Sequence, residues 1–132
     1  CFPRTMFELA CKGIDPLKVG ADQFGSPTLT DDLAAATLGL IDQNAAGLFH
    51  ATNSGRTNWK DFTEAIMRQW NLRNGVEPLT SAQWKQIKPQ SAHRPMNSVL
   101  NLSKIQAALG RPMRAWPEAL ADYHGQVTGQ GF

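Results

Sequence analysis

The sequence predicts an α/β fold that is mostly helical and contains a few short strands. In residues 1–53, segments with apolar residues at helical spacing alternate with short β-type segments, and the connections are short. After residue 53 the pattern is mainly helical. The 132 residues, 42% of them apolar, suffice for one domain with a hydrophobic core and leave little room for two.

The chain opens with an amphipathic helical pattern. Residues 2–12 carry apolar side chains at helical spacing, and Gly13 follows as a C-terminal stop. Residues 17–21 have the composition of a short strand, and the loop DQFGSPT at residues 22–28 follows it. The order is then expected to repeat, with a second helix and a second strand.

The second helix is predicted to begin after Thr30, a natural N-cap, and to end before Gly47. Residues 47–52, GLFHAT, read as a buried strand. Two parallel strands leave their edges uncovered, so partner strands are expected upstream of Cys1. The buried stripe of the helix is predicted to consist of Leu33, Ala36, Thr37, Leu40 and Ile41.

The later part of the chain is predicted to contain four helical segments. Residues 58–71 form the first, with an apolar face of Trp59, Phe62, Ile66 and Trp70. After a turn at Asn74-Gly75 and the stretch 76–79, Thr80 caps a short helical turn through Trp84. Ser103 is expected to cap a helix that follows an extended piece. The last helix spans residues 116–123, and the Gly/Gln-rich tail 125–132 is expected to fray.

Composition excludes several classes of protein. The net charge of +2 is spread along the chain without a basic run, so nucleic acid is not an expected partner. No apolar stretch approaches the roughly 20 residues that span a bilayer, and a signal-peptide pattern is missing, so a soluble cytoplasmic protein is expected. Cys1 and Cys11 bracket one predicted helix and are expected to be reduced. The start at Cys1, without Met, suggests a cut rather than a natural start.

No complete catalytic or metal-binding constellation is visible. His50, His93 and His124 are far apart, and no Cys or His stands at ligand spacing beside them; His50 is interpreted as a strand residue. Asp31 and Asp32 fall in the first turn of a predicted helix, where its dipole favours acids. Phosphate-cradling glycine loops and Ser/His/Asp arrangements are also missing.

Two segments remain as candidate binding elements. Turn chemistry accounts for most of DQFGSPT, but it explains neither Gln23 nor Thr28. Arg94 stands in a proline-limited stretch close to Asn97 and Ser98, and its planar guanidinium suits a diphosphate or a carboxylate. Taken alone, these residues favour the alternative of a solvated surface arginine.

Several motifs in this order resemble the dTDP-4-dehydrorhamnose reductases, within the extended short-chain dehydrogenase/reductases. The resemblance rests on DQFGSPT, DLAAATLGLI, GLFHATNSGRTNWKDFTEAI, RPMNSVLNLSKIQAALG and a final W-x-E-A-L, and it covers almost all of residues 2–123. It implies the carboxy-terminal portion of a Rossmann-like fold. Residues 1–53 would supply the last α/β elements of the nucleotide-binding fold and the substrate loop, and residues 54–132 a mainly helical substrate-binding subdomain.

The resemblance also implies an activity. Family members reduce the 4-keto group of dTDP-4-dehydro-L-rhamnose with NADPH to give dTDP-L-rhamnose for cell-surface polysaccharide, and a Tyr-x-x-x-Lys motif supplies the proton. The single tyrosine here, Tyr123, is followed four residues later by Val127, and the glycine-rich cofactor turn is missing. NADPH is therefore expected to bind mainly to a missing amino-terminal domain, and this fragment alone is expected to be inactive.

The resemblance carries over to individual residues. Gln23, Gly25, Pro27 and Thr28 would shape the substrate pocket, Arg94 would pair with the diphosphate of the dTDP-sugar, and Asn97 and Ser98 would orient that segment. Thr28 could instead belong only to the helix start. Leu29, where an aromatic residue is frequent in the family, leaves the sugar preference open.

Two alternatives stand beside the reductase. The same family includes non-catalytic regulatory subunits, and a chain that is natural as it stands could be a helical interaction module. Some family members are magnesium-dependent dimers, so a homodimer and a magnesium ion are carried as secondary expectations, although no acidic cluster can be assigned to a metal. The choice between NADPH and NADH is not fixed by these residues.

Overall fold

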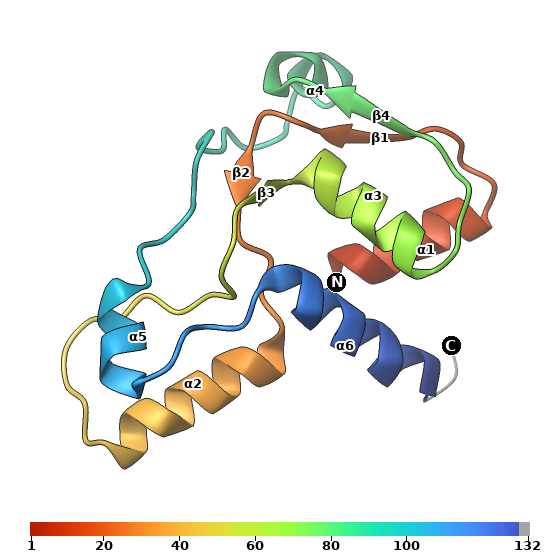
Figure 1. Cartoon of the computed structure of the whole chain (residues 1–132). Coiled ribbons are helices and arrows are strands. Elements are labelled where there is room, and N and C mark those ends of the chain that lie inside the picture. The colour runs from red at the N-terminus through yellow and green to blue at the C-terminus, as the bar shows by residue number, and fades with distance from the viewer. Residues whose placement is uncertain (130–132) are drawn as a thin grey trace. The chain divides into compact units, whose positions relative to one another are not determined.

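The computed structural model describes residues 1–129, which fold into six helices and four short strands (Figure 1). Two compact units interleave along the chain. Unit 1 comprises Cys1–Phe24 and Thr57–Ser98, and unit 2 comprises Gly25–Arg56 and Val99–Phe132. The predicted division by role at residue 53 stays a prediction. The elements are α1 (Phe2–Cys11), β1 (Leu17–Gly20), β2 (Phe24–Gly25), α2 (Thr30–Asp42), β3 (Thr57–Asn58), α3 (Trp59–Gln69), β4 (Val76–Leu79), α4 (Ser81–Ile87), α5 (Ser103–Leu109) and α6 (Trp116–Gly129).

Unit 1 is built on a parallel pair of strands, β1 and β4, with α1 and α3 on one side of the pair (Figure 1). The predicted strand at residues 17–21 is confirmed as β1, and β4 is its partner among the described residues. The expectation of further strands upstream of Cys1 stays a prediction. Leu17 pairs with Val76 and Gly20 with Leu79. Pro78 obscures β4 in the sequence pattern, because proline has no N–H to donate to a strand ladder. A two-stranded sheet tolerates the proline, since both of its strands are edge strands.

The core of unit 1 lies between α1, α3 and the strand pair. Of the predicted apolar face of α3, Ile66 is fully buried and Phe62 almost so, whereas Trp59 is 39% exposed, so the predicted face is confirmed only in part. The ring of Phe2 stacks 5.7 Å from that of Phe62. Asn58 caps α3 through its side chain, which accepts from the backbone N–H of Asp61. Gly13 ends α1 in the left-handed region at φ 80°, which confirms the predicted stop.

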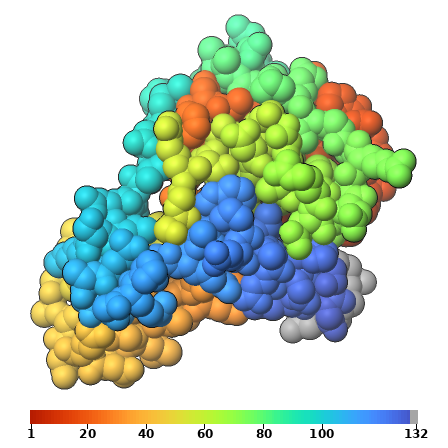
Figure 2. All heavy atoms as spheres, in the orientation of Figure 1, coloured from red at the N-terminus to blue at the C-terminus, as the bar shows by residue number. Residues whose placement is uncertain are grey.

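The shortest helix of unit 1 begins as predicted. Thr80 accepts a hydrogen bond from the backbone N–H of Gln83, whose side chain accepts in return from the backbone N–H of Thr80. This reciprocal capping box fixes the first turn of α4. The helix continues past the predicted Trp84 to Ile87. Part of α3 remains at the surface of unit 1 (Figure 2), and the exposed residues of that helix include Asp61 and Arg68.

Unit 2 consists of α2, α5 and α6 around a small core. Its centre is formed by Ala36, Ile105 and Met113, and further apolar side chains pack against them: Leu40, Phe49, Ala51, Leu102 and Leu109. The predicted stripe of α2 is partly wrong, because Leu33 is 40% and Ile41 63% exposed. Within unit 2, α2 packs against α5 on the side that carries Ala36, and the side that carries Leu33 and Ile41 remains exposed.

Two predicted N-caps are shifted by one residue. The N-cap of α2 is Leu29, not Thr30, and that of α5 is Leu102, not Ser103. In both cases an asparagine side chain outside the helix binds a backbone N–H at the start. Asn53 Oδ1 accepts from Leu29, and Asn101 Oδ1 accepts from Ser103. The Asn53 contact spans 24 positions and cannot be read from local sequence, whereas Asn101 lies only two residues before Ser103.

The predicted strand at residues 47–52 is not formed. This segment has no ladder partner in the part of the chain that the structure describes, and Leu48 is 76% exposed. An apolar run becomes a strand only where a neighbouring strand meets its N–H and C=O groups. Here the Leu48 carbonyl instead accepts from Lys104 Nζ at 2.7 Å. His50 is therefore an exposed residue of an irregular segment, and its interpretation as a strand residue is wrong.

The last helix is longer than predicted. α6 continues from Trp116 to Gly129, so residues 125–129 of the supposedly frayed tail are helical; residues 130–132 lie outside the described part. Both cysteines are free and exposed, in agreement with reduced thiols. Between residues 1 and 129, the structure contains no helix with the length and apolar character needed to cross a membrane.

Candidate functional site

In unit 1, the first residues of the DQFGSPT loop are held by the start of α4. The carboxylate of Asp22 accepts two hydrogen bonds from Ser81, one from its backbone N–H (2.7 Å) and one from its hydroxyl (2.9 Å). The side-chain amide of Gln23 donates to the same Ser81 hydroxyl at 2.9 Å. All three residues are half-buried. The side chain of Gln23 is thus fixed by a contact 58 positions away in the sequence.

The second candidate segment runs beside the same loop. The backbone N–H of Phe24 donates to the Met96 carbonyl, and the backbone N–H and hydroxyl of Ser98 both donate to the Phe24 carbonyl, at 2.9 Å, 2.9 Å and 3.0 Å. Phe24 and Asn97 form a parallel bridge. Unit 1 therefore brings Gln23 close to Asn97 and Ser98, two adjacent residues that follow it by more than 70 positions in the sequence.

Arg94 lies three residues before Asn97 in this segment and is exposed. Within residues 1–129 its guanidinium has no hydrogen-bond or ion-pair partner. An arginine whose charge no carboxylate neutralises retains its full capacity to bind an anion. The same exposure also fits the solvated arginine that the sequence left as the alternative.

The remaining predicted site residues, Gly25, Pro27 and Thr28, belong to unit 2 and are half-buried. The hydroxyl of Thr28 donates to the Ser26 carbonyl at 3.0 Å and accepts from the backbone N–H of Asn53 at 3.2 Å. Both functions of this hydroxyl are therefore used inside unit 2. This geometry fits the alternative that Thr28 secures the helix start, and it leaves the Thr28 methyl group and one acceptor lone pair of the hydroxyl for contact with a ligand.

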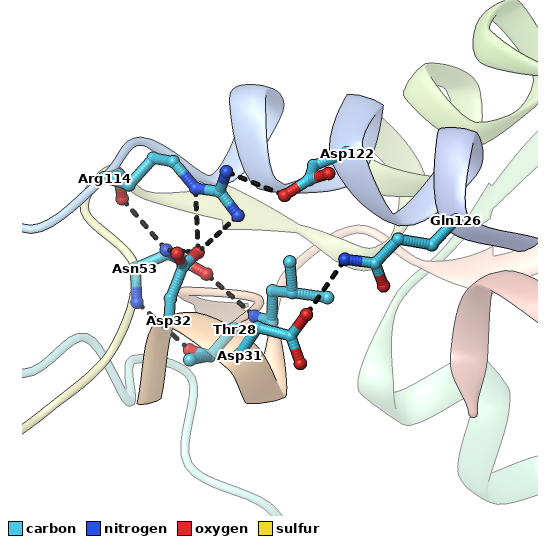
Figure 3. Close-up of polar contacts among 8 residues, drawn as sticks. Thr28, Asp31, Asp32, Asn53, Arg114, Asp122 and Gln126 are labelled. Carbon is cyan, nitrogen blue, oxygen red and sulfur yellow. Dashed lines mark hydrogen bonds and ion pairs between the residues drawn. The ribbon is translucent and has the colours of Figure 1, made fainter. Parts of the chain in front are cut away.

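Asn53 connects three segments of unit 2 and is fully buried (Figure 3). Its Oδ1 accepts from the Leu29 backbone N–H at 2.8 Å, and its Nδ2 donates to Asp32 Oδ2 at 2.6 Å and to the Arg114 carbonyl at 3.1 Å. Each hydrogen-bonding atom of the amide has a partner, as a buried polar side chain requires. The end of the DQFGSPT loop is thereby tied to the segment that precedes α6.

Arg114 completes this network with two carboxylates (Figure 3). Its guanidinium binds Asp32 through Nε and Nη2 and Asp122 through Nη1, each at 2.9 Å. The bonds to Asp122 first, and those to Asp32 next, raise the pKa of Arg114 above its usual value, against the effect of burial. Gln126 adds a contact from α6 to Asp31 at 2.9 Å. The first-turn placement of Asp31 and Asp32 is confirmed, and Asp32 also has this ionic role.

Sequence reasoning missed Ser81, Asn53 and Arg114. Asn53 directly follows the run GLFHAT, and a polar residue at the end of an apolar run is a local signal for a buried hydrogen-bonding role. No comparable signal marked Ser81, whose contacts to Asp22 and Gln23 span 59 and 58 positions, or Arg114, whose contact to Asp32 spans 82 positions. Across residues 1–129 no group of three His, Cys, Asp or Glu side chains could hold a metal ion.

Comparison with known proteins relates this geometry to a family. The family model described as the RmlD substrate binding domain matches residues 1–128. The chain is 38% identical over 122 residues to the spore coat polysaccharide biosynthesis protein SpsK of Bacillus subtilis, covering 92% of the chain and 41% of that protein. It is 35% identical to the dTDP-4-dehydrorhamnose reductase of Burkholderia thailandensis, covering 90% and 44%.

The fold of this chain is also similar to that of solved structures of such reductases. The dTDP-4-dehydrorhamnose reductase of Bacillus anthracis, in complex with NADP, superposes with a TM-score of 0.85 at 28% identity over 96% of this chain and 42% of the other. The chain thus spans less than half the length of these relatives. The predicted fold class, the α/β carboxy-terminal portion of a Rossmann-like extended short-chain dehydrogenase/reductase, is confirmed. The match over nearly the whole chain shows that it belongs to the RmlD substrate binding domain family.

Proposed function

We propose that this chain is the substrate-binding part of an NADPH-dependent reductase that converts dTDP-4-dehydro-L-rhamnose to dTDP-L-rhamnose for polysaccharide biosynthesis in the cytoplasm. The family match over residues 1–128 carries this proposal. Two further findings support it: relatives are named for this reduction and for spore coat polysaccharide biosynthesis, and one similar reductase binds NADP. NADPH would be bound mainly outside residues 1–132, which would be inactive alone.

The proposed substrate site in unit 1 consists of Gln23, Arg94, Asn97 and Ser98. The hydrogen bonds between Phe24 and the Met96–Ser98 segment support it, because they hold the two candidate motifs side by side. Ser98 would fix the segment, and Arg94 would bind the diphosphate with its guanidinium. We further propose that Gly25 and Pro27 shape the following part of the loop and that Thr28 mainly secures its end.

Replacing Arg94 tests the diphosphate contact. In the full-length protein, Arg94→Ala should weaken binding of dTDP-L-rhamnose by about 2 kcal/mol, or about 30-fold in Kd, because a charge-assisted bidentate contact is lost. Isothermal titration calorimetry measures this. Raising the salt concentration should weaken binding by the wild type more than binding by the variant, since the lost contact is ionic.

Arg73→Ala is the matched control. Arg73 is also an exposed arginine of unit 1 without a side-chain partner among residues 1–129, and it lies before β4. Its removal changes the net charge by the same amount and should leave the Kd within roughly twofold. Equal affinity of the Arg94 variant and the wild type would rule out the diphosphate role.

A non-catalytic regulatory homologue is the second candidate function, and the fragment's lack of a Tyr-x-x-x-Lys motif keeps it open. The full-length protein distinguishes the two. A reductase oxidises NADPH when dTDP-4-dehydro-L-rhamnose is added, which is followed by the absorbance of NADPH. A regulatory homologue binds the dTDP-sugar, or a partner enzyme, without turnover.

We also propose that the full-length protein forms a homodimer and depends on a magnesium ion. Light scattering tests the dimer, and an activity assay with a chelator tests the need for magnesium.

A further inference from the structure

Ser81 joins two residues of the DQFGSPT loop through one hydroxyl group. Its Oγ lies 2.9 Å from Asp22 Oδ1 and 2.9 Å from Gln23 Nε2. The backbone N–H of Ser81 binds the other oxygen of Asp22 at 2.7 Å, so this carboxylate is held at both oxygens by one residue. Asp22 is thereby a rigid acceptor beside the Ser81 hydroxyl.

This arrangement determines which way the amide of Gln23 faces. A carboxylate can only accept, so the single hydroxyl hydrogen of Ser81 goes to Asp22. Met96 Sδ, at 3.9 Å from the same hydroxyl, is a weaker acceptor. The lone pairs of Ser81 Oγ then need a donor, and within the carboxamide of Gln23 only Nε2 can donate. The Gln23 carbonyl oxygen Oε1 therefore faces away from Ser81.

Oε1 of Gln23 is left without a partner among residues 1–129. We propose that Ser81, fixed by Asp22, is a positioning residue that presents this oxygen as a hydrogen-bond acceptor to a hydroxyl or N–H group of the bound nucleotide sugar. This inference rests on the proposed function of the loop. A diphosphate offers no donor at neutral pH, so Gln23 and Arg94 would recognise different parts of one ligand.

Two variants of Ser81 test the role in the full-length protein, with dTDP-L-rhamnose as the probe. Ser81→Ala removes the hydroxyl that orients Gln23 and should raise the Kd about five- to tenfold. Ser81→Thr keeps a hydroxyl at the same position and should restore the Kd to within roughly twofold of the wild type. A Kd that is unchanged in Ser81→Ala would overturn the proposal.

A control separates positioning from a general weakening of α4. Thr80→Ala removes the N-cap of the same helix but touches neither Asp22 nor Gln23. Both alanine variants should lower the stability of α4, and only Ser81→Ala should weaken binding. An equal loss of affinity in the two variants would show that Ser81 acts through helix stability alone, which contradicts the proposal.

The double variant with Gln23→Ala provides the most specific test. If Ser81 acts through Gln23, then Ser81→Ala should cause no further loss of affinity once the Gln23 amide has been removed. Losses that add fully would mean that Ser81 acts by another route and would overturn the proposal. Gln23→Ala alone should weaken binding by about the same factor as Ser81→Ala.

The orientation of Gln23 can also be measured without a ligand. In a nitrogen-15 NMR spectrum of the wild type, the side-chain amide hydrogens of Gln23 should exchange more slowly than those of exposed glutamines, and Ser81→Ala should remove this protection. Fast exchange in the wild type would overturn the positioning role. Slow exchange in a protein that does not bind dTDP-L-rhamnose would instead refute the proposed function, so the two failures are distinguishable.

Discussion

Asn53→Ala is expected to destabilise unit 2 by about 3 kcal/mol. The change removes three side-chain hydrogen bonds from a fully buried position, to the Leu29 N–H, to Asp32 and to the Arg114 carbonyl. Each buried group left without a partner costs about 1 to 3 kcal/mol, and those nearer the surface regain water in part. Urea denaturation of the full-length protein, followed by circular dichroism, measures the change.

Asn101→Ala is the matched control for this prediction. Asn101 also lies in unit 2, but it is exposed and its side chain makes one local bond, to the Ser103 N–H at 2.8 Å. Its replacement should cost about 1 kcal/mol or less. If both variants lost the same small amount, Asn53 would not be the connection that holds the loop end to the segment before α6.

Ile66→Ala is expected to destabilise unit 1 by about 2 to 5 kcal/mol. Ile66 is fully buried on α3, where this helix meets α1 and the β1–β4 pair, so the shorter side chain leaves a cavity. Because unit 1 carries Gln23 and Arg94, the fraction of protein able to bind the ligand should fall on heating sooner than in the wild type. Thermal denaturation with and without dTDP-L-rhamnose measures both effects.

The control for Ile66 is another isoleucine of unit 1. Ile87, the last residue of α4, is 54% exposed, so Ile87→Ala should change the free energy of unfolding by about 0.5 kcal/mol or less. A similar loss in both isoleucine variants would contradict the assignment of the unit 1 core to the apolar face of α3.

The helices could be predicted from the sequence because their signals are local. The apolar spacing in residues 2–12 and 58–71, the glycine stop at Gly13 and the cap at Thr80 each depend on a few neighbouring residues. The strands depended on distant partners. Residues 47–52 have the composition of a strand but no ladder partner among residues 1–129, whereas 76–79 pair with β1 in spite of Pro78.

In the candidate site, too, the local motifs could be predicted and the contacts between distant residues could not. The composition of DQFGSPT and of the Arg94 segment, with their family resemblance, identified both motifs, and the structure joins them through the backbone of Phe24. The residues that hold them could not be predicted. Ser81 and Asn53 act across 59 and 24 positions respectively, to Asp22 and Leu29, and such contacts are determined by the packing of units rather than by spacing.

Hydrogen–deuterium exchange of the full-length protein, with and without saturating dTDP-L-rhamnose, tests substrate binding by this chain most directly. If residues 22–24 and 94–98 of unit 1 form the site, peptides that cover these two segments should exchange more slowly with the ligand bound, and a peptide over the exposed Leu38 and Ile41 of α2 should not change. Tight binding with protection confined to other parts of the protein would contradict the proposed site.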